Sequence, residues 1–107
     1  MKKLFIIFLI ISYGFISYEK GPIYTATWYD TSPYPKVHRN YSTAAFNLYN
    51  KGDKLLVTNI LNDKSDTVVI TDRHKCSNTH IDLSKTSFSK IASLTQGRIK
   101  VTITKIK

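Results

Sequence analysis

The sequence is short of cysteine, which limits how the fold can be stabilised. Cys76 is the single cysteine in 107 residues, so no disulfide can form within the chain, and a lone cysteine is more often a small buried residue than a nucleophile. Internal repeats and low-complexity linkers are missing too, and this length is typical of one small domain. We therefore expect a single fold that depends on its hydrophobic core.

Acidic residues are also scarce. Asp and Glu together number 7 against 16 Lys and Arg, which gives a formal net charge of +9. This charge favours an anionic partner, either nucleic acid, an anionic lipid surface or an acidic wall polymer. The basic residues are spread along the chain, so an ordinary solvated surface is the alternative.

The N-terminus has no apolar run of the length that a membrane-spanning helix needs, which is about 20 residues. Residues 1–17 instead combine a basic start, an apolar middle and small polar residues, which is the layout of a secretory signal peptide. We expect export to the periplasm, the cell envelope or the medium, and a mature domain over residues 22–107. Membrane contact is expected only through an uncleaved signal segment, and export makes nucleic acid the least favoured partner.

Four stretches have the pattern of β-strands. Residues 23–29 are dense in aromatic and β-branched residues. Residues 54–60 and 66–71 predict a hairpin around a polar turn, and residues 98–104 alternate apolar and polar side chains as a final strand. The conformation of residues 42–46 cannot be told from their periodicity. Together the patterns predict a compact, mainly β barrel with a short helix.

Residues 79–83, which precede the predicted helix, also have the pattern of a strand. Alternation turns Ile81 and Leu83 to one face and His80 and Asp82 to the other. Apolar residues then recur at helical spacing, and Ser84 is placed to be the N-cap. The sequence therefore predicts that Asp82 faces away from the core.

The few acids can be sorted by their positions. Glu19 lies beside the expected cleavage point of the signal. Three aspartates fall at the ends of predicted hairpin strands, where bonding to the local backbone is the ordinary explanation; they are Asp53, Asp63 and Asp66.

Three aspartates remain as candidates for chemistry, and in one barrel they can approach the same rim; they are Asp30, Asp72 and Asp82. Each has a structural alternative. Asp30 fits a turn, Asp72 fits an ion pair with Arg73, and Asp82 fits a cap or a favourable contact with the helix dipole.

A metal site is not expected. His74, Cys76 and His80 would supply three ligands from one loop with no obvious fourth, whereas zinc sites in proteins are built on tetrahedral ligand sets. The spacing of the cysteine and the histidines carries no signature of covalent catalysis either. We therefore predict no metal and no cofactor.

Four sequence blocks resemble those of a known family. "ATWYD" (residues 26–30), "STAAF" (42–46) with "LLVTN" (55–59), "ITDR" (70–73) and "HIDLSKTSFSKIA" (80–92) occur in this order over most of the expected mature chain. They are similar to the double-psi β-barrel domain of the rare lipoprotein A family, and more distantly to the barrels of expansins and barwin-like endoglucanases.

The resemblance implies a fold and two kinds of function. The fold would be a six-stranded double-psi β-barrel with one or two short helices. The chain would act, as a monomer, on peptidoglycan or another cell-wall polysaccharide. It would be either a lytic transglycosylase that uses one aspartate as acid and base, or a non-catalytic, expansin-like binding module.

The resemblance also implies roles for the three candidate aspartates. Asp82 matches the family's catalytic acid, and Asp72 matches a neighbouring aspartate that precedes an arginine, here Arg73. Asp30 stands where endoglucanases of this barrel place a second carboxylate.

Substrate contacts are expected from two aromatic residues and from the basic residues near the aspartates. The aromatic residues are Trp28 and Tyr29, for which packing in the core is the alternative; the basic residues are His38, Arg73 and His80. The chain departs from the family pattern in three places. The loop before "STAAF" is short and lacks the family's glutamate, and the histidine that should follow Ala45 is Phe46. The Gly-Pro that should follow Asp-Arg is His74-Lys75.

Overall fold

The computed structural model describes residues 21–31, 40–74 and 77–107. The expected signal segment, His38 and Cys76 lie outside these ranges. In the described part of the chain, no helix is long and apolar enough to pass through a bilayer.

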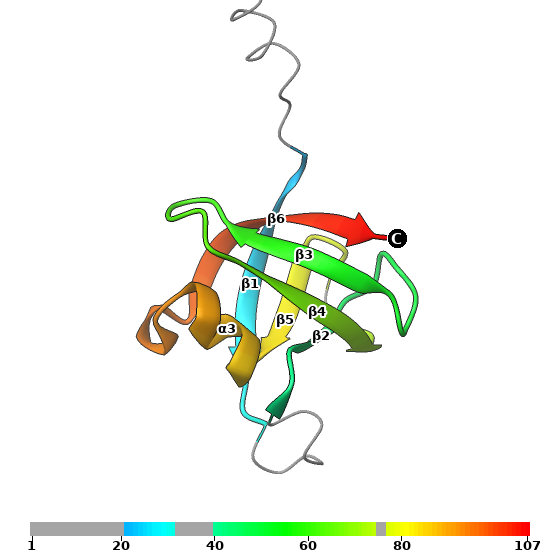
Figure 1. Ribbon diagram of the computed structural model, residues 1–107, viewed down its shortest axis with the longest axis horizontal. Coiled ribbons are helices and arrows are strands. Elements are labelled where there is room, and N and C mark those ends of the chain that lie inside the picture. Colours follow the sequence, from blue (N-terminus) through cyan, green and yellow to red (C-terminus); the bar gives the residue numbers. More distant parts are fainter. Residues whose placement is uncertain (1–20, 32–39, 75–76) are drawn as a thin grey trace, which may run out of the picture.

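Six strands and a short helix make up the described fold (Figure 1). In chain order the elements are β1 (Ile23–Tyr29), β2 (Thr43–Ala45), β3 (Lys54–Asn59), β4 (Ser65–Asp72), β5 (His80–Ser84), α3 (Lys85–Ile91), the 3-10 turn η1 (Leu94–Gln96) and β6 (Arg98–Ile106).

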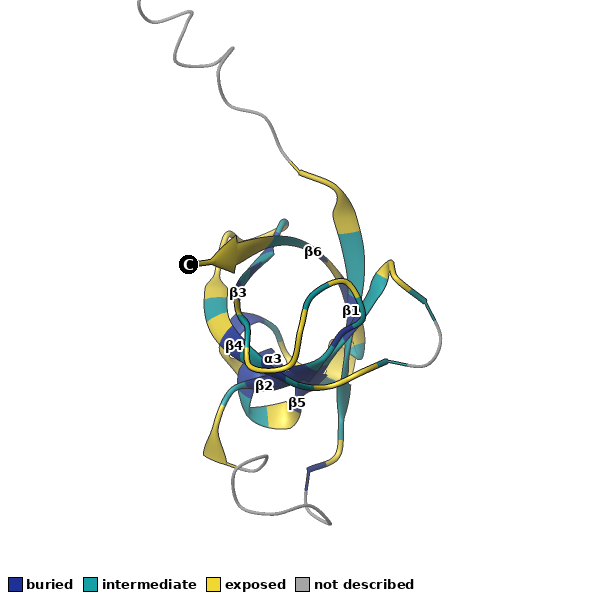
Figure 2. Cartoon of the chain, turned by 90° about the vertical axis from the view of Figure 1, so that its right-hand side faces the viewer, coloured by how far each residue is buried: buried dark blue, intermediate teal, exposed yellow. Residues whose placement is uncertain are grey.

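The strands close into one barrel in the order β1-β5-β2-β4-β3-β6, and Figure 2 looks into this ring. β1 with β5 and β2 with β4 are parallel pairs, whereas the other four neighbouring pairs are antiparallel. The predicted mainly β, six-stranded barrel is confirmed. Because closure leaves no edge strand, every strand has a partner on both sides.

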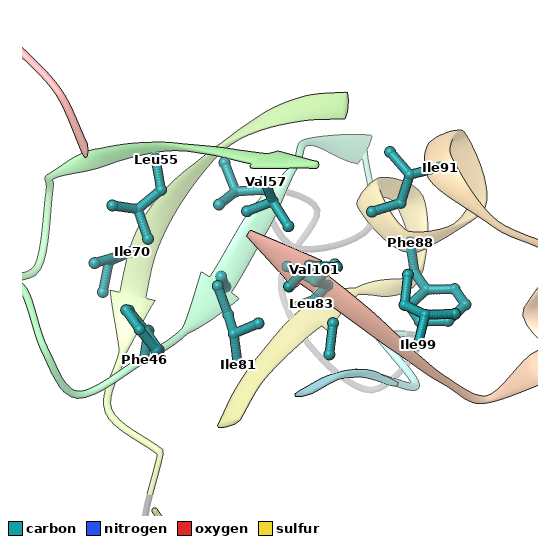
Figure 3. Close-up of a cluster of buried hydrophobic side chains, with 13 residues drawn as sticks. Phe46, Leu55, Val57, Ile70, Ile81, Leu83, Phe88, Ile91, Ile99 and Val101 are labelled. Carbon is teal, nitrogen blue, oxygen red and sulfur yellow. The ribbon is translucent and has the colours of Figure 1, made fainter. Parts of the chain in front are cut away.

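The core follows from alternation along the strands. Inward-facing residues such as Leu55, Ile70 and Ile81 are at most 1% exposed, and their neighbours face outward. Phe88 and Ile91 extend from α3 toward these strand side chains and close one end of the barrel (Figure 3). Each large apolar side chain buried in this way stabilises the fold by about 1.5–3 kcal/mol.

Ser84 starts the helix, as predicted. Its Oγ accepts a hydrogen bond from the backbone N–H of Ser87 at 3.3 Å and one from that of Thr43 at 3.1 Å, and it donates to the Tyr41 carbonyl at 3.2 Å. The N-cap thus also anchors β2 to β5. Asp82 is not the cap of α3, so the capping interpretation of Asp82 is wrong.

The turn acids behave in two ways. Asp53 Oδ2 accepts the Asn50 N–H at 3.0 Å, and Asp63 has a left-handed backbone with φ 62, so both are turn residues as predicted. Asp66 instead lies within β4, paired with Val57. Its carboxylate accepts a hydrogen bond from Ser42 and lies 3.8 Å from Lys90 Nζ. The turn interpretation of Asp66 is therefore wrong, because the strand begins one residue before it.

Candidate functional site

β5 presents Asp82 on the outside of the barrel. Its neighbours Ile81 and Leu83 are fully buried, whereas Asp82 is half-buried and faces outward. On the adjacent strands Asp82 pairs with Thr27 and with Ala45. Both of these flanking residues have short side chains.

Five residues form a row across the barrel surface, which we call the Asp82 row; in strand order they are Arg98, Thr27, Asp82, Ala45 and Asp72. Side chains paired across strands point to the same side of a sheet. With strands about 4.8 Å apart, the Cα atoms of Arg98 and Asp72 each lie about 10 Å from that of Asp82. The row therefore has a cation on one side of Asp82 and a second carboxylate on the other.

An irregularity in the pairing of β2 with β4, in which β4 carries the extra residue, brings Asp72 into this row. Ala44 pairs with Ile70, so a regular ladder would pair Ala45 with Thr71, but the register shifts and Ala45 pairs with Asp72. Such a bulge re-aims the side chains of the strand that carries the extra residue. Asp72 is exposed as a result, and it lies two strands from Asp82.

Among the described residues, the Asp82 carboxylate accepts its hydrogen bond from a side chain. Thr27 Oγ1 donates to Asp82 Oδ1 at 2.9 Å, and Thr27 Oγ1 also lies 2.6 Å from His80 Nε2. The His80 ring in turn stacks on that of His74, with centroids 4.5 Å apart. Burial first, and then His74 and Arg98, lower the pKa of His80, while Asp82 opposes this shift.

One arginine and one lysine side chain on β6 form a cationic edge beside this site. Arg98 pairs with Thr27, and Lys100 pairs with Thr25, to whose Oγ1 it donates a hydrogen bond at 2.9 Å. Among the described residues, neither Arg98 nor Lys100 forms an ion pair with a carboxylate. We call these two residues the cationic edge.

The structure places one of the other two candidate aspartates in the same row as Asp82. Asp72 and Asp82 share the Asp82 row, whereas Asp30 is exposed beyond the end of β1, three residues after Thr27. At about 3.3 Å per residue, this places Asp30 about 10 Å along the strand direction from the row.

Arg73 does not pair with its neighbour in the way that the ion-pair alternative requires. Its guanidinium donates to the Asn47 carbonyl at 3.0 Å, and only its backbone N–H bonds to Asp72 Oδ1, at 2.9 Å. In the described ranges the ion pairs are those of Asp66 and Asp53 with lysines. Asp72 is therefore not neutralised by Arg73.

Trp28 points into the barrel, whereas Tyr29 lies two residues after Thr27 and alternates onto the same outer face as the Asp82 row. Trp28 pairs with the buried Leu83, packs against the core and donates from Nε1 to the Leu94 carbonyl at 3.1 Å. The Tyr29 hydroxyl lies 3.1 Å from Thr43 Oγ1. The Trp28 contacts fit the packing alternative, and sugar binding by these residues stays a prediction.

Sequence reasoning missed the residues that hold and flank Asp82. Thr27 could be assigned to the outer face, because it alternates with the apolar Ala26 and Trp28, but not to Asp82, from which it is 55 residues away. His74 was considered only as a metal ligand. Of the described residues, no three His, Cys, Asp or Glu side chains gather so as to hold a metal ion.

One family model matches the chain. It is described as lytic transglycolase and covers residues 24–103, which include all six strands in whole or in part. This match confirms the resemblance drawn from the four sequence blocks. An uncharacterised protein of Synechocystis sp. is 42% identical over 55 residues, 51% of this chain and 58% of that protein. The chain thus spans little more than half the length of this relative.

Solved structures share the fold at low sequence identity. An expansin variant of Clavibacter michiganensis in complex with cellohexaose has a TM-score of 0.66 and 18% identity, over 79% of this chain and 50% of the expansin. The Streptomyces papain inhibitor has a TM-score of 0.63 and 22% identity, over 82% of this chain and 97% of the inhibitor. Cerato-platanin 3 from M. perniciosa has a TM-score of 0.61 and 11% identity, over 80% of this chain and 95% of its own.

Proposed function

We propose that this chain cleaves peptidoglycan glycan strands with Asp82 as acid and base. The premise is its family, since the chain belongs to the lytic transglycolase family of rare lipoprotein A-like double-psi β-barrels. The observation that carries the proposal is the placement of Asp82. Its carboxylate faces outward between two short side chains and is held by the Thr27 hydroxyl. The expansin that shares the fold holds a cellohexaose chain, which supports a polysaccharide as the partner.

The lytic reaction needs one carboxyl group. As a neutral acid, Asp82 gives its proton to the glycosidic oxygen while the bond from C1 to that oxygen breaks. The sugar's own 6-hydroxyl then closes on C1, and the Asp82 carboxylate takes the hydroxyl proton. The acid is regenerated, and the product carries a 1,6-anhydro ring.

The spacing of the acids favours this route over hydrolysis. A retaining hydrolase needs its two carboxyl groups about 5–5.5 Å apart, and an inverting one about 6.5–9.5 Å apart. Asp72 lies two strands from Asp82, with Cα atoms about 10 Å apart. Asp72 therefore acts as an electrostatic neighbour.

Replacement of Asp82 by asparagine tests the proposal. Release of anhydro-sugar products from purified sacculi and from isolated glycan strands, measured by mass spectrometry, should fall by at least about 10²-fold, the lower end of general acid catalysis. Asp63→Asn is the matched control, because it removes the same charge at an exposed turn whose left-handed φ asparagine tolerates. Equal product from wild type and Asp82→Asn would exclude Asp82 from the mechanism.

A second candidate is a wall-binding module without cleavage. Two observations favour it: Phe46, at the position of the family's histidine, is 0% exposed, and the cationic edge has no carboxylate partner among the described residues. This module would sediment with peptidoglycan in a salt-sensitive way and release no anhydro-sugar. Sedimentation should weaken when Arg98 and Lys100 are both changed to glutamine, and should be unchanged in Lys51→Gln, an exposed turn position.

A further inference from the structure

We propose that His80, Thr27 and Asp82 form a directed hydrogen-bond chain through which His80 supplies the proton that makes Asp82 a neutral acid. His80 is thus a positioning residue that acts through Thr27. The catalytic consequence rests on the proposed function, whereas the hydrogen-bond chain is a property of the folded protein and can be measured without substrate.

The strand register places one hydroxyl between two ionisable groups. Thr27 pairs directly with Asp82, and His80 lies two residues earlier on β5, on the same outer face. Thr27 Oγ1 is 2.9 Å from Asp82 Oδ1 and 2.6 Å from His80 Nε2. The distance to Asp82 is ordinary for a hydroxyl donor, and the distance to His80 is slightly shorter than is usual for a nitrogen donor.

The chemistry of the three groups fixes the direction of the chain. A hydroxyl has one hydrogen, and an ionised carboxylate can only accept. Thr27 therefore donates to Asp82, so its oxygen must accept from His80. It follows that neutral His80 carries its hydrogen on Nε2 and leaves Nδ1 without one.

The same arrangement can move a proton without any other reactant. When His80 is an imidazolium, its Nε2 proton passes to Thr27 Oγ1 while the Thr27 proton passes to Asp82 Oδ1. Imidazolium and carboxylate become imidazole and carboxylic acid, and the threonine is unchanged. The carboxylic acid is the form in which Asp82 protonates a glycosidic oxygen.

The surroundings of His80 favour release of this proton. From the loop after β4, His74 stacks on the ring, and from β6, Arg98 and Lys100 lie across Thr27 and Thr25. On its own strand, Asp82 is the only charge that opposes them. β1 places Thr25 and Thr27 beside His80. Taken together, the described neighbours of His80 make its imidazolium a readier proton donor than that of an isolated histidine.

Nitrogen NMR of the histidine rings, on the full chain, tests the direction of the chain. Neutral His80 in the wild type should be the Nε2–H tautomer, and Thr27→Val should reduce the share of that tautomer. Thr25→Val is the matched control: Thr25 also pairs with His80, but its hydroxyl accepts from Lys100, so the tautomer should not change. An Nδ1–H tautomer in the wild type, or an unchanged ratio in Thr27→Val with the fold intact, overturns the inference.

The consequence for catalysis has its own readout. In His80→Gln, cleavage should fall more at pH 5, where a larger share of wild-type His80 is the imidazolium that can donate, than at pH 7. A uniform loss at both pH values would indicate a structural role for His80 and overturn the relay. If no variant and no wild type cleaves glycan while the tautomer is as expected, the proposed function fails and the hydrogen-bond chain stands.

Discussion

Replacing Phe46 by histidine restores the residue that the family carries after its two alanines, yet it should destabilise this barrel and restore no site. Phe46 is 0% exposed. The centroid of its ring lies 5.5 Å from that of the Tyr24 ring and 6.1 Å from that of the Tyr49 ring. Ala45, one residue earlier, is the position that faces outward in the Asp82 row. An imidazole at position 46 would therefore enter the core and not the surface beside Asp82.

The size of the effect follows from these contacts. Each aromatic pair contributes about 0.5–1.5 kcal/mol beyond its buried area, so the two pairs together contribute about 1–3 kcal/mol. A buried ring N–H without a partner costs a further 1–3 kcal/mol or so. We expect a loss of about 3 kcal/mol or more, which is a large part of the roughly 5–15 kcal/mol that stabilises a small domain.

Urea unfolding followed by the fluorescence of Trp28 measures this loss, because Trp28 is the single tryptophan and packs against the core. With an m-value of about 1–1.5 kcal/mol/M, the midpoint should fall by about 2–3 M. Phe46→Leu is the control, since it loses the ring pairs but adds no polar atom and should cost about half as much. A midpoint of Phe46→His equal to that of the wild type, or a gain in glycan cleavage, would refute the placement of Phe46 in the core.

Two further predictions concern stability. The pKa of His80 is lowered in the folded state from its ordinary value of about 6.5, so the unfolded chain binds more protons, and the free energy of unfolding should fall as the pH drops below 6.5. Urea unfolding at pH 7.5 and 5.5 should show this fall in the wild type and a smaller one in His80→Gln; equal falls would contradict it. Ser84→Ala should lower the free energy of unfolding by about 1–2 kcal/mol through loss of the N-cap, whereas Ser89→Ala, at an exposed helix position, should change it little in the same assay.

Local patterns were sufficient to predict most strands of this fold. β1 has the predicted bounds. β3 begins at the predicted residue and ends one residue early, and β4 is one residue longer than predicted at each end. β6 extends beyond the predicted alternation. β2 could not be predicted, because three residues of mixed polarity have no readable period. Its conformation is set by pairing with β4 and β5, which are far away in the sequence.

In the candidate site too, local alternation predicts some features, and others depend on pairing between distant strands. That Asp82 faces outward follows from alternation with Ile81 and Leu83, and the sequence predicted it. That Thr27 holds the carboxylate depends on a parallel pairing between strands 55 residues apart. That Asp72 joins the row depends on a bulge, which shifts the register by one residue and has no signal in the composition of β2 or β4.

The scarcity of acids makes these non-local pairings decisive for any chemistry on the barrel. Of the described aspartates, Asp53 and Asp63 bind or shape turns, and Asp66 is occupied by Ser42 and Lys90. A one-residue slip of β5 would turn Asp82 into the core and Ile81 out to solvent, because side chains alternate along a strand. Ile81 and Leu83, the two apolar residues that stabilise β5, thereby fix the direction of Asp82. Stability of the core and presentation of the acid are consequently one property of this strand, and a change that loosens Ile81 or Leu83 acts on both.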